Sequence, residues 1–313
     1  MITVLCGGVG AAKFLEGLIH SDLDEEIVAI VNVGDDEEIY GLHISPDIDT
    51  IVYTLSDLVD RERGWGTKGE TYQALNRLKE LGAPTWFTLG DRDIGLHLFR
   101  RHLLDSGHTL SEVTDVITKA HHLPLQIIPS TNQRLRTMIL AEGDQDELLS
   151  FQRYFVERRH QPRVKGIYFT GSSEAAPAPG VIDAIESSRM VIIAPSNPLL
   201  SIAPIIAVDG VRKALESAKS KAIAISPIVG GRAIKGPADR ILESLGYPVS
   251  PEGAARVLAP YITTMVIDSI DAHISQNLID QGIGVFVTNT MMIDIDSKID
   301  LAKQVLSVAG TLK

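Results

Sequence analysis

The sequence predicts an α/β fold: a doubly wound, mainly parallel sheet of the Rossmann-like type, with a smaller insertion of helices and antiparallel strands. Short runs rich in Val and Ile alternate along the chain with segments of helical pattern. Most of these runs are apolar throughout, which is typical of strands buried on both faces of a parallel sheet. The first run also passes through glycines into a segment rich in Ala and Leu, as a strand–turn–helix unit does.

The expected strands follow one another at intervals that leave room for helices. Helical patterns lie between them, for example at residues 211–220 and 238–245. In a doubly wound sheet, ligands bind at the carboxyl ends of the strands, so the residues that follow each strand are the first candidates for function. The expected strands are residues 2–5, 27–32, 85–89, 190–194, 222–225, 264–267 and 284–288.

The alternation breaks down in the middle of the chain. Residues 96–104 and 110–120 have helical patterns, and the apolar runs at 126–128 and 136–140 are separated by polar residues, which predicts an antiparallel hairpin or small sheet. We therefore expect a Rossmann-like core made of residues 1–93 and 167–313, interrupted by an insertion at residues 94–166.

The composition narrows the class of protein. The chain has 313 residues, of which 44% are hydrophobic and 22% charged, as in ordinary globular proteins. A net charge of −11 argues against sequence-independent nucleic-acid binding, which needs a cationic surface. No apolar stretch has the length of a membrane span, and the single cysteine fits a reducing compartment. We expect a cytoplasmic protein with neither a nucleic-acid nor a membrane partner.

The glycines after the first strand predict a phosphate site. Gly7, Gly8 and Gly10 precede a helical segment, whose N-terminus would present unpaired N–H groups and the positive end of the helix dipole. Lys13 would add a full positive charge. The simpler interpretation is that the glycines make only a tight turn.

This glycine loop matches neither of two common fingerprints. The dinucleotide pattern G-x-G-x-x-G needs a third glycine where the chain has Lys13. The triphosphate pattern needs Gly-Lys-Ser/Thr, which does not occur nearby. Neither a standard NAD site nor a standard ATPase follows from the loop.

Four carboxylates follow the second strand: Asp35, Asp36, Asp47 and Asp49. One carboxylate at this place is enough to bind a ribose hydroxyl, whereas clustered carboxylates beside a phosphate site are the oxygen ligands that magnesium prefers. Alternatively, some of them cap helices, and Asp49 in particular could start the helix that begins with the apolar residues after it.

Two other strand ends carry candidate binding residues. Arg92 follows the third expected strand and is suited to bind an anion, or else pairs with a neighbouring aspartate at the surface. Ser196 and Asn197 lie between two prolines after the fourth, where they make either a second nucleotide contact or a structural turn.

Taken in order, these motifs resemble the 2-phospho-L-lactate transferase (CofD) family over residues 1–290. Each motif alone is weak, but the set is specific. The matching segments are Cys6-Gly7-Gly8-Val-Gly10-Ala-Ala-Lys13, Asn32-Val-Gly-Asp35-Asp36, Tyr40-Gly-Leu-His-Ile-Ser-Pro46-Asp47-Ile-Asp49-Thr50, Leu89-Gly-Asp-Arg92-Asp93 and Ala194-Pro-Ser196-Asn197-Pro198.

The resemblance implies a role in the synthesis of coenzyme F-420. The family transfers a 2-phospho-L-lactyl group from lactyl-2-diphospho-5′-guanosine to the deazaflavin Fo, and GMP leaves; in bacterial relatives the donor carries enolpyruvyl. The resemblance also implies a need for magnesium and a homodimeric state. Such a transfer depends mainly on positioning and on neutralising charge at the phosphoryl oxygens.

The resemblance assigns roles to individual residues. Gly7, Gly8, Gly10, Lys13, Ser196 and Asn197 would hold the guanosine diphosphate moiety, Asp35 and Asp47 would bind the metal, and Asp49, Thr88 and Arg92 would line the deazaflavin pocket. Either Asp36 or Asp49 would act as the base for the attacking hydroxyl. Trp65 lies in a glycine-rich loop that is either a lid or an ordinary surface turn.

Two alternatives remain at this stage. A nicotinamide-dependent dehydrogenase has the same fold plan, but the missing third glycine and the excess of carboxylates argue against it. A non-catalytic nucleotide-sugar-sensing protein of a related family shares the glycine loop. The acidic segment that contains Asp47 and Asp49 favours metal chemistry and therefore the transferase.

Overall fold

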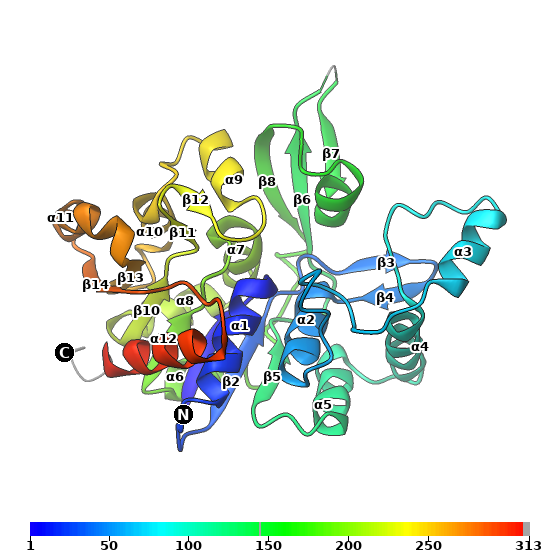
Figure 1. Ribbon diagram of the computed structural model, residues 1–313, viewed down its shortest axis with the longest axis horizontal. Coiled ribbons are helices and arrows are strands. Elements are labelled where there is room, and N and C mark those ends of the chain that lie inside the picture. Colours follow the sequence, from blue (N-terminus) through cyan, green and yellow to red (C-terminus); the bar gives the residue numbers. More distant parts are fainter. Residues whose placement is uncertain (144, 309–313) are drawn as a thin grey trace.

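A computed structural model describes residues 1–143 and 145–308 and contains a central parallel sheet of seven strands (Figure 1). Every neighbouring pair in this sheet is parallel. The predicted fold class is therefore confirmed. In spatial order the strands are β14 (Gly284–Thr288), β13 (Thr264–Asp268), β10 (Ala222–Ile225), β9 (Met190–Ile193), β1 (Ile2–Cys6), β2 (Ile27–Val31) and β5 (Gln126–Pro129).

The chain winds outward from the middle of the sheet in two directions. From β1 it passes to β2 and β5 on one side, and from β9 to β10, β13 and β14 on the other. Because crossovers between parallel strands are right-handed, opposite directions place the connecting helices on opposite faces. Strand order reverses between β1 and β9, and the crevice at such a reversal is where ligands bind in this class of fold.

Helices cover both faces of the sheet. On one side α1 packs against α2 and α12, and elsewhere α6 packs against α8. The α-helices are α1 (Gly8–Ile19), α2 (Pro46–Leu55), α3 (Gln73–Glu80), α4 (Asp91–Asp105), α5 (Leu110–Ala120), α6 (Val181–Ser187), α7 (Ala203–Ile206), α8 (Val211–Ser217), α9 (Ala238–Ser244), α10 (Pro251–Leu258), α11 (Ser275–Asp280) and α12 (Ile295–Val308).

Smaller elements surround the sheet. The antiparallel strands β7, β6 and β8 stand at the top of the view in Figure 1, and the hairpin of β3 and β4 extends toward α3 and α4 at the right. These elements are β3 (Glu37–Ile39), β4 (Leu42–Ile44), β6 (Arg136–Ala141), β7 (Glu147–Ser150), β8 (Val164–Thr170), β11 (Ile228–Val229), β12 (Arg232–Ala233), the π-helices η1 (Arg153–Glu157) and η2 (Pro198–Ile202), and the 3₁₀ helices η3 (Lys219–Lys221) and η4 (Ser269–Ile274).

The apolar runs of the sequence form the core. All residues of β1, β2, β9 and β10 are buried. Burial on both faces explains why these strands are apolar at every position instead of at alternate ones. In the described residues, no helix is both long and apolar enough to cross a membrane.

Residues 85–89 were predicted to form a strand, and this prediction is wrong because the segment is irregular. Trp86, Phe87 and Leu89 pack in a separate cluster with Ile39 and Ile44 of the β3–β4 hairpin. The apolar residues that suggested a strand are therefore used under a hairpin, away from the sheet.

For 126–128 and 136–140 we predicted a hairpin or a small antiparallel sheet; the hairpin is wrong, whereas 136–140 does lie in a small antiparallel sheet. The first run is β5, which pairs in parallel with β2, and the second is β6, which pairs with β7 and β8. Both runs have the period of a strand, but partner choice depends on contacts with distant segments that the local pattern does not contain.

The stretch from residue 94 to residue 166 therefore supplies β5 to the central sheet as well as helices and antiparallel strands outside it. The division into a core and an insertion stays a prediction. Residue 144 of the predicted insertion and residues 309–313 of the predicted core lie outside the described part of the chain.

Candidate active site

The glycine loop lies at the strand-order reversal, between β1 and α1. Gly8 has a φ of +73°, a conformation that side chains with a Cβ rarely adopt. A Cβ on Gly10 would stand 2.2 Å from the carbonyl oxygen of Pro195, so the start of α1 can approach the end of β9 only with glycine at this position. The loop is built for close backbone approach.

Asp47 lies directly against this loop. Its Oδ1 accepts a 2.8 Å hydrogen bond from the N–H of Gly8, and its Oδ2 accepts a 3.0 Å bond from Nδ2 of Asn32. Burial raises the pKa of Asp47 to about 7; the bonds from Asn32 and Gly8 oppose the rise, and the nearby charge of Asp36 adds to it. The predicted metal residue Asp47 thus lies beside the predicted phosphate loop.

The end of β9 meets the loop from the other side. The hydroxyl of Ser196 donates a 2.8 Å hydrogen bond to the carbonyl of Gly7 and accepts a 3.3 Å bond from the Gly7 N–H. Oδ1 of Asn197 accepts bonds from the N–H groups of Leu199 and Leu200 and so caps η2. Nδ2 of Asn197 is buried and has no partner within the described residues.

Lys13 lies on α1, and its amine contacts the backbone of a segment far away in the sequence. Nζ donates a 3.1 Å hydrogen bond to the carbonyl of Met292. Burial lowers the pKa of Lys13, and the positive charges of Lys298 and Lys235 lower it further. The amine is therefore close to other cations, and its predicted role in phosphate binding stays a prediction.

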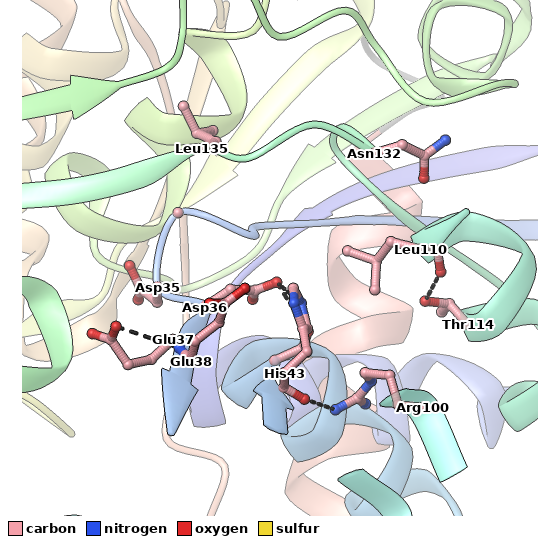
Figure 2. Close-up of polar contacts among 12 residues, drawn as sticks. Asp35, Asp36, Glu37, Glu38, His43, Arg100, Leu110, Thr114, Asn132 and Leu135 are labelled. Carbon is pink, nitrogen blue, oxygen red and sulfur yellow. Dashed lines mark hydrogen bonds and ion pairs between the residues drawn. The ribbon is translucent and has the colours of Figure 1, made fainter. Parts of the chain in front are cut away.

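Asp35 and Asp36 follow β2 but face different neighbours. The Asp36 carboxylate points toward His43, and the Asp35 carboxylate points away from it (Figure 2). Oδ2 of Asp36 lies 2.9 Å from both Nε2 of His43 and the hydroxyl of Ser45. Oδ1 of Asp35 and Oδ1 of Asp36 are both buried without a hydrogen-bond partner.

The carboxylates of Asp35 and Asp47 lie in a setting that disfavours negative charge. Burial raises the pKa of Asp35 well above its usual range, and the charges of Asp47 and Asp36 raise it further. In the described part of the chain, neither Asp35 nor Asp47 forms an ion pair with Lys, Arg or His. A cation would therefore be stabilised here.

Magnesium, which the resemblance implies, fits these residues chemically. The unpartnered, buried oxygen of Asp35 is an available ligand, and Asp47 lies against the phosphate loop. Across residues 1–143 and 145–308, no group of three or more His, Cys, Asp or Glu side chains is arranged to hold a metal ion. Magnesium usually takes only one or two carboxylates and completes its shell with water and phosphate oxygens.

A cavity of about 360 Å³ opens on the other side of α2. Asp49 and Thr88, two of the three residues predicted to line a deazaflavin pocket, line this cavity. Trp65, whose side chain is 48% exposed, also lines it. The complete lining is Ile44, Pro46, Asp49, Thr50, Tyr53, Trp65, Gly66, Phe87, Thr88, Leu89, Asp93, His97, Gln152, Phe155 and Val156.

Arg92, the third predicted residue, is not part of the cavity lining. Its side chain is exposed, and Nη1 donates a 2.8 Å hydrogen bond to the carbonyl of Lys68. Glu70 accepts a 2.8 Å hydrogen bond from the backbone N–H of Arg92 and another from the hydroxyl of Thr67. These bonds hold the first turn of α4 against residues 67–70. The structure therefore places Arg92 outside the lining of the cavity.

Asp49 is half of a buried ion pair with Arg100. The Arg100 side chain is 1% exposed, and its Nη1 and Nη2 donate to the two oxygens of Asp49. Nη1 of Arg100 also donates to the carbonyl of His43, as Figure 2 shows. Burial lowers the pKa of the neighbouring His97 to about 4, so this imidazole is neutral at neutral pH. The negative charge of Asp49 is therefore compensated by Arg100.

The alternative role predicted for Asp49 was to cap the start of a helix, but the helix that contains it starts before this residue. α2 begins at Pro46, with Ser45 as the N-cap residue, so Asp49 lies inside the first turn and does not cap the helix. Proline at the first helical position needs no N–H partner, which suits this start. This alternative for Asp49 is wrong.

Sequence reasoning missed several residues of this site. Asp93, His97 and Arg100 have the spacing i, i+4 and i+7 on α4, and all are buried. Polar side chains that repeat at this spacing on a predicted helix indicate a polar face turned inward, and this signal could have found them. The role of Asn32, which orients Asp47, has no such local signal.

Comparisons with known proteins show the family of the chain. The family model "2-phospho-L-lactate transferase CofD" matches residues 2–308. The chain is 37% identical over 313 residues to a 2-phospho-L-lactate transferase of Methanocaldococcus jannaschii, covering 100% of this chain and 99% of that protein. It is 38% identical over 314 residues to a phosphoenolpyruvate transferase of Nocardia farcinica, covering 99% of this chain and 95% of that protein.

Among solved structures, a UPF0052 family protein of Bacillus halodurans superposes with a TM-score of 0.66 over 97% of this chain and 98% of that chain. At 14% identity this similarity supports the fold alone. The family match extends over nearly the whole described chain, and relatives of matching length bear transferase names. The protein is a transferase that belongs to the 2-phospho-L-lactate transferase (CofD) family.

Proposed function

We propose that the enzyme transfers the 2-phospho-L-lactyl group of lactyl-2-diphospho-5′-guanosine to the deazaflavin Fo, giving coenzyme F-420-0 and GMP. One observation carries this proposal: the same turn of α2 borders both the glycine loop and the cavity. Asp47 accepts a hydrogen bond from Gly8, and Asp49, two residues later, lines the cavity. A donor on the loop and an acceptor in the cavity would therefore meet at this turn.

The glycine loop and the end of β9 would bind the guanosine diphosphate part of the donor. Backbone N–H groups at the start of α1 suit phosphate oxygens, and the close approach of Gly10 to Pro195 brings both segments together. Ser196 would hold the loop through Gly7, and the unpartnered Nδ2 of Asn197 would donate to the nucleotide. Lys13 would add charge near the phosphates.

Asp35 and Asp47 would hold magnesium, which when bound supplies positive charge to the phosphoryl oxygens. The chain itself would align the two substrates, since transfer of this kind depends on an in-line arrangement of attacking and leaving oxygens. Asp36 and Asp49 are the two carboxylates proposed to receive the proton of the attacking hydroxyl. Of these two, Asp49 lines the cavity, and Arg100 holds its carboxylate in place.

The acceptor would lie in the cavity with its ring against aromatic side chains. Trp65, Phe87 and Phe155 line the cavity, and planar rings pack well on such walls. Thr88 would contact the acceptor from the cavity wall, and Arg92 would reach it after its side chain leaves the carbonyl of Lys68. We also propose a homodimer, which the resemblance to this family implies, and a cytoplasmic location, in keeping with the single cysteine.

The test is direct. The purified protein is mixed with Mg²⁺, Fo and either the lactyl or the enolpyruvyl guanosine donor, and GMP and the deazaflavin product are separated and quantified. Product from the lactyl donor at a rate above that from the enolpyruvyl donor supports the proposal. Thermal stabilisation by a UDP-sugar or by NAD, with no product from either donor, would contradict it.

A further inference from the structure

Asp93 lines the cavity from the first turn of α4. It is the third residue of α4, and its side chain is only 8% exposed. Oδ1 accepts a 2.7 Å hydrogen bond from the hydroxyl of Tyr53, which also lines the cavity. Oδ2 lies on the side of Gly66, 3.9 Å from where a Cβ on that residue would stand.

The other charged groups of the cavity are already paired. Asp49 is bound at both oxygens by Arg100, and Nδ1 of His97 lies 3.1 Å from Nη1 of the same arginine. Asp93 has no cationic partner among the described residues. A buried carboxylate without a cation is costly unless hydrogen-bond donors satisfy it, and Tyr53 supplies one such donor.

The walls around Asp93 favour a planar ligand. Trp65, Phe87 and Phe155 supply aromatic surface, and Ile44, Leu89 and Val156 supply aliphatic surface. In such an apolar pocket a few polar groups fix the orientation of the ligand. The Asp93 carboxylate would fix it through an N–H or O–H group on the edge of the ring.

We propose that Asp93 determines acceptor specificity, by accepting a hydrogen bond from an N–H or O–H group on the ring of the acceptor. This inference rests on the proposed function in taking the cavity as the acceptor site. Asp49 lies at the turn next to the glycine loop, and Tyr53 lies one helical turn further along α2. Asp93, which bonds Tyr53, would therefore contact the ring end, and the attacking hydroxyl would lie nearer Asp49.

The ionisation of Asp93 gives this contact a pH dependence. The pKa of Asp93 is raised to about 6, mainly by burial and in addition by the charges of Asp49 and Glu70. The Tyr53 hydroxyl and the Gly90 N–H act in the opposite direction. On α4, His97 is neutral and the charge of Arg100 is paired with Asp49. Acceptor binding should strengthen as pH rises through this range, because the ionised carboxylate is the stronger hydrogen-bond acceptor.

The experiment measures the dissociation constant of Fo by its fluorescence, with GDP and Mg²⁺ present, between pH 5 and pH 8. In Asp93→Asn, the amide oxygen still accepts from Tyr53, so an N–H group faces the ring and meets another donor. We expect Fo to bind at least about tenfold more weakly, while the dissociation constant of GDP changes less than about twofold. In wild type the dissociation constant of Fo should fall as pH rises past about 6, and this pH step should be absent in Asp93→Asn.

Two further variants separate recognition from structure. In Tyr53→Phe the carboxylate stays but loses the bond that lowers its pKa, so the pH step should move upward. Asp105→Asn, at the exposed end of the same helix, should bind Fo like the wild type. Fo analogues methylated at each ring N–H or O–H group should identify the contact, since one of them should bind wild-type protein about as weakly as Asp93→Asn binds Fo.

The possible outcomes are distinct. Fo binding that is unchanged in Asp93→Asn, with its pH step retained, would overturn the role of Asp93 whether or not transfer occurs. Wild-type protein that binds Fo with an Asp93-dependent pH step but forms no product would contradict the proposed reaction and leave the recognition role supported. Wild-type protein that does not bind Fo at all would overturn both.

Discussion

The N–H of Gly8 donates a 2.8 Å hydrogen bond to Oδ1 of Asp47, a residue 39 positions later in the chain. This bond joins the glycine loop to the first turn of α2. Asn32 at the end of β2 holds the other oxygen of Asp47 at 3.0 Å, so three separate segments meet at one carboxylate. The phosphate loop and the acidic segment are therefore one structural unit.

Asp47→Asn should abolish transfer while the fold is kept. An amide can still accept from Gly8, but its N–H₂ group would face Nδ2 of Asn32, placing two donors together. The neutral amide is also a weaker ligand for Mg²⁺, so nucleotide affinity measured with Mg²⁺ should fall at least about tenfold. Calorimetric titration with GDP and Mg²⁺ measures the affinity, with the exposed Asp115→Asn as the control. Near-normal transfer by Asp47→Asn would remove this residue from the metal site.

Gly10→Ala and Gly95→Ala should have opposite effects on stability. A Cβ at position 10 would stand 2.2 Å from the backbone oxygen of Pro195, so α1 or the end of β9 must move. At position 95, inside α4, a Cβ meets no atom within 4 Å. Gly95→Ala should therefore stabilise the protein by about 0.5–1 kcal/mol through helix propensity. Urea unfolding measures both, and a Gly10→Ala variant as stable as wild type would refute the close-approach argument.

Asn197→Asp should separate helix capping from nucleotide binding. Aspartate caps a helix as well as asparagine does, so the bonds from Leu199 and Leu200 should persist and the melting temperature should change little. The variant loses the unpartnered Nδ2 donor and gains negative charge. GDP affinity should fall at least about tenfold. If affinity is unchanged, Nδ2 does not contact the nucleotide.

Arg100→Met should destabilise the protein more than the double change with Asp49→Asn. Removing Arg100 alone leaves the buried carboxylate of Asp49 uncompensated, which costs about 3–5 kcal/mol. Neutralising Asp49 as well removes that charge, so part of the loss should be recovered. A double-mutant cycle by urea unfolding measures the coupling, and additive effects would show that the pair is not coupled.

Asp93→Asn should change how stability depends on pH. The pKa of Asp93 is raised from 3.8 to about 6, so the folded protein binds a proton that the unfolded chain releases between these values. The stability due to this group is complete below about pH 4 and falls as pH rises to about 6, by at most about 3 kcal/mol. The asparagine of the variant does not titrate, so the variant does not lose stability from this group as pH rises. Its stability relative to wild type should therefore rise between pH 4 and pH 7 in urea titrations.

A constant difference in stability between Asp93→Asn and wild type across that pH range would contradict the raised pKa. Other buried carboxylates, such as Asp35 and Asp47, also titrate, but they are present in both proteins. Their contribution cancels when the two stability curves are subtracted, so the comparison isolates Asp93.

Local sequence patterns were sufficient for the fold class. The runs that became β1, β2, β9 and β10 are apolar at every position because both faces of the sheet are covered. The same patterns were insufficient for residues 85–89 and for β5. Both segments read as strands, and only contacts with distant residues decided that one packs under the β3–β4 hairpin and the other pairs with β2.

The candidate site divides in the same way. The sequence by itself determined the glycine loop, the four acidic residues after β2 and the Ser196-Asn197 turn, because backbone geometry at strand ends demands particular residue types. Only the tertiary structure decided that Asp47 bonds Gly8, that Asp49 pairs with Arg100, and that Asp93 lines the cavity while Arg92 does not. Those relationships depend on the packing of α2 and α4 in space, which no local spacing in the chain encodes.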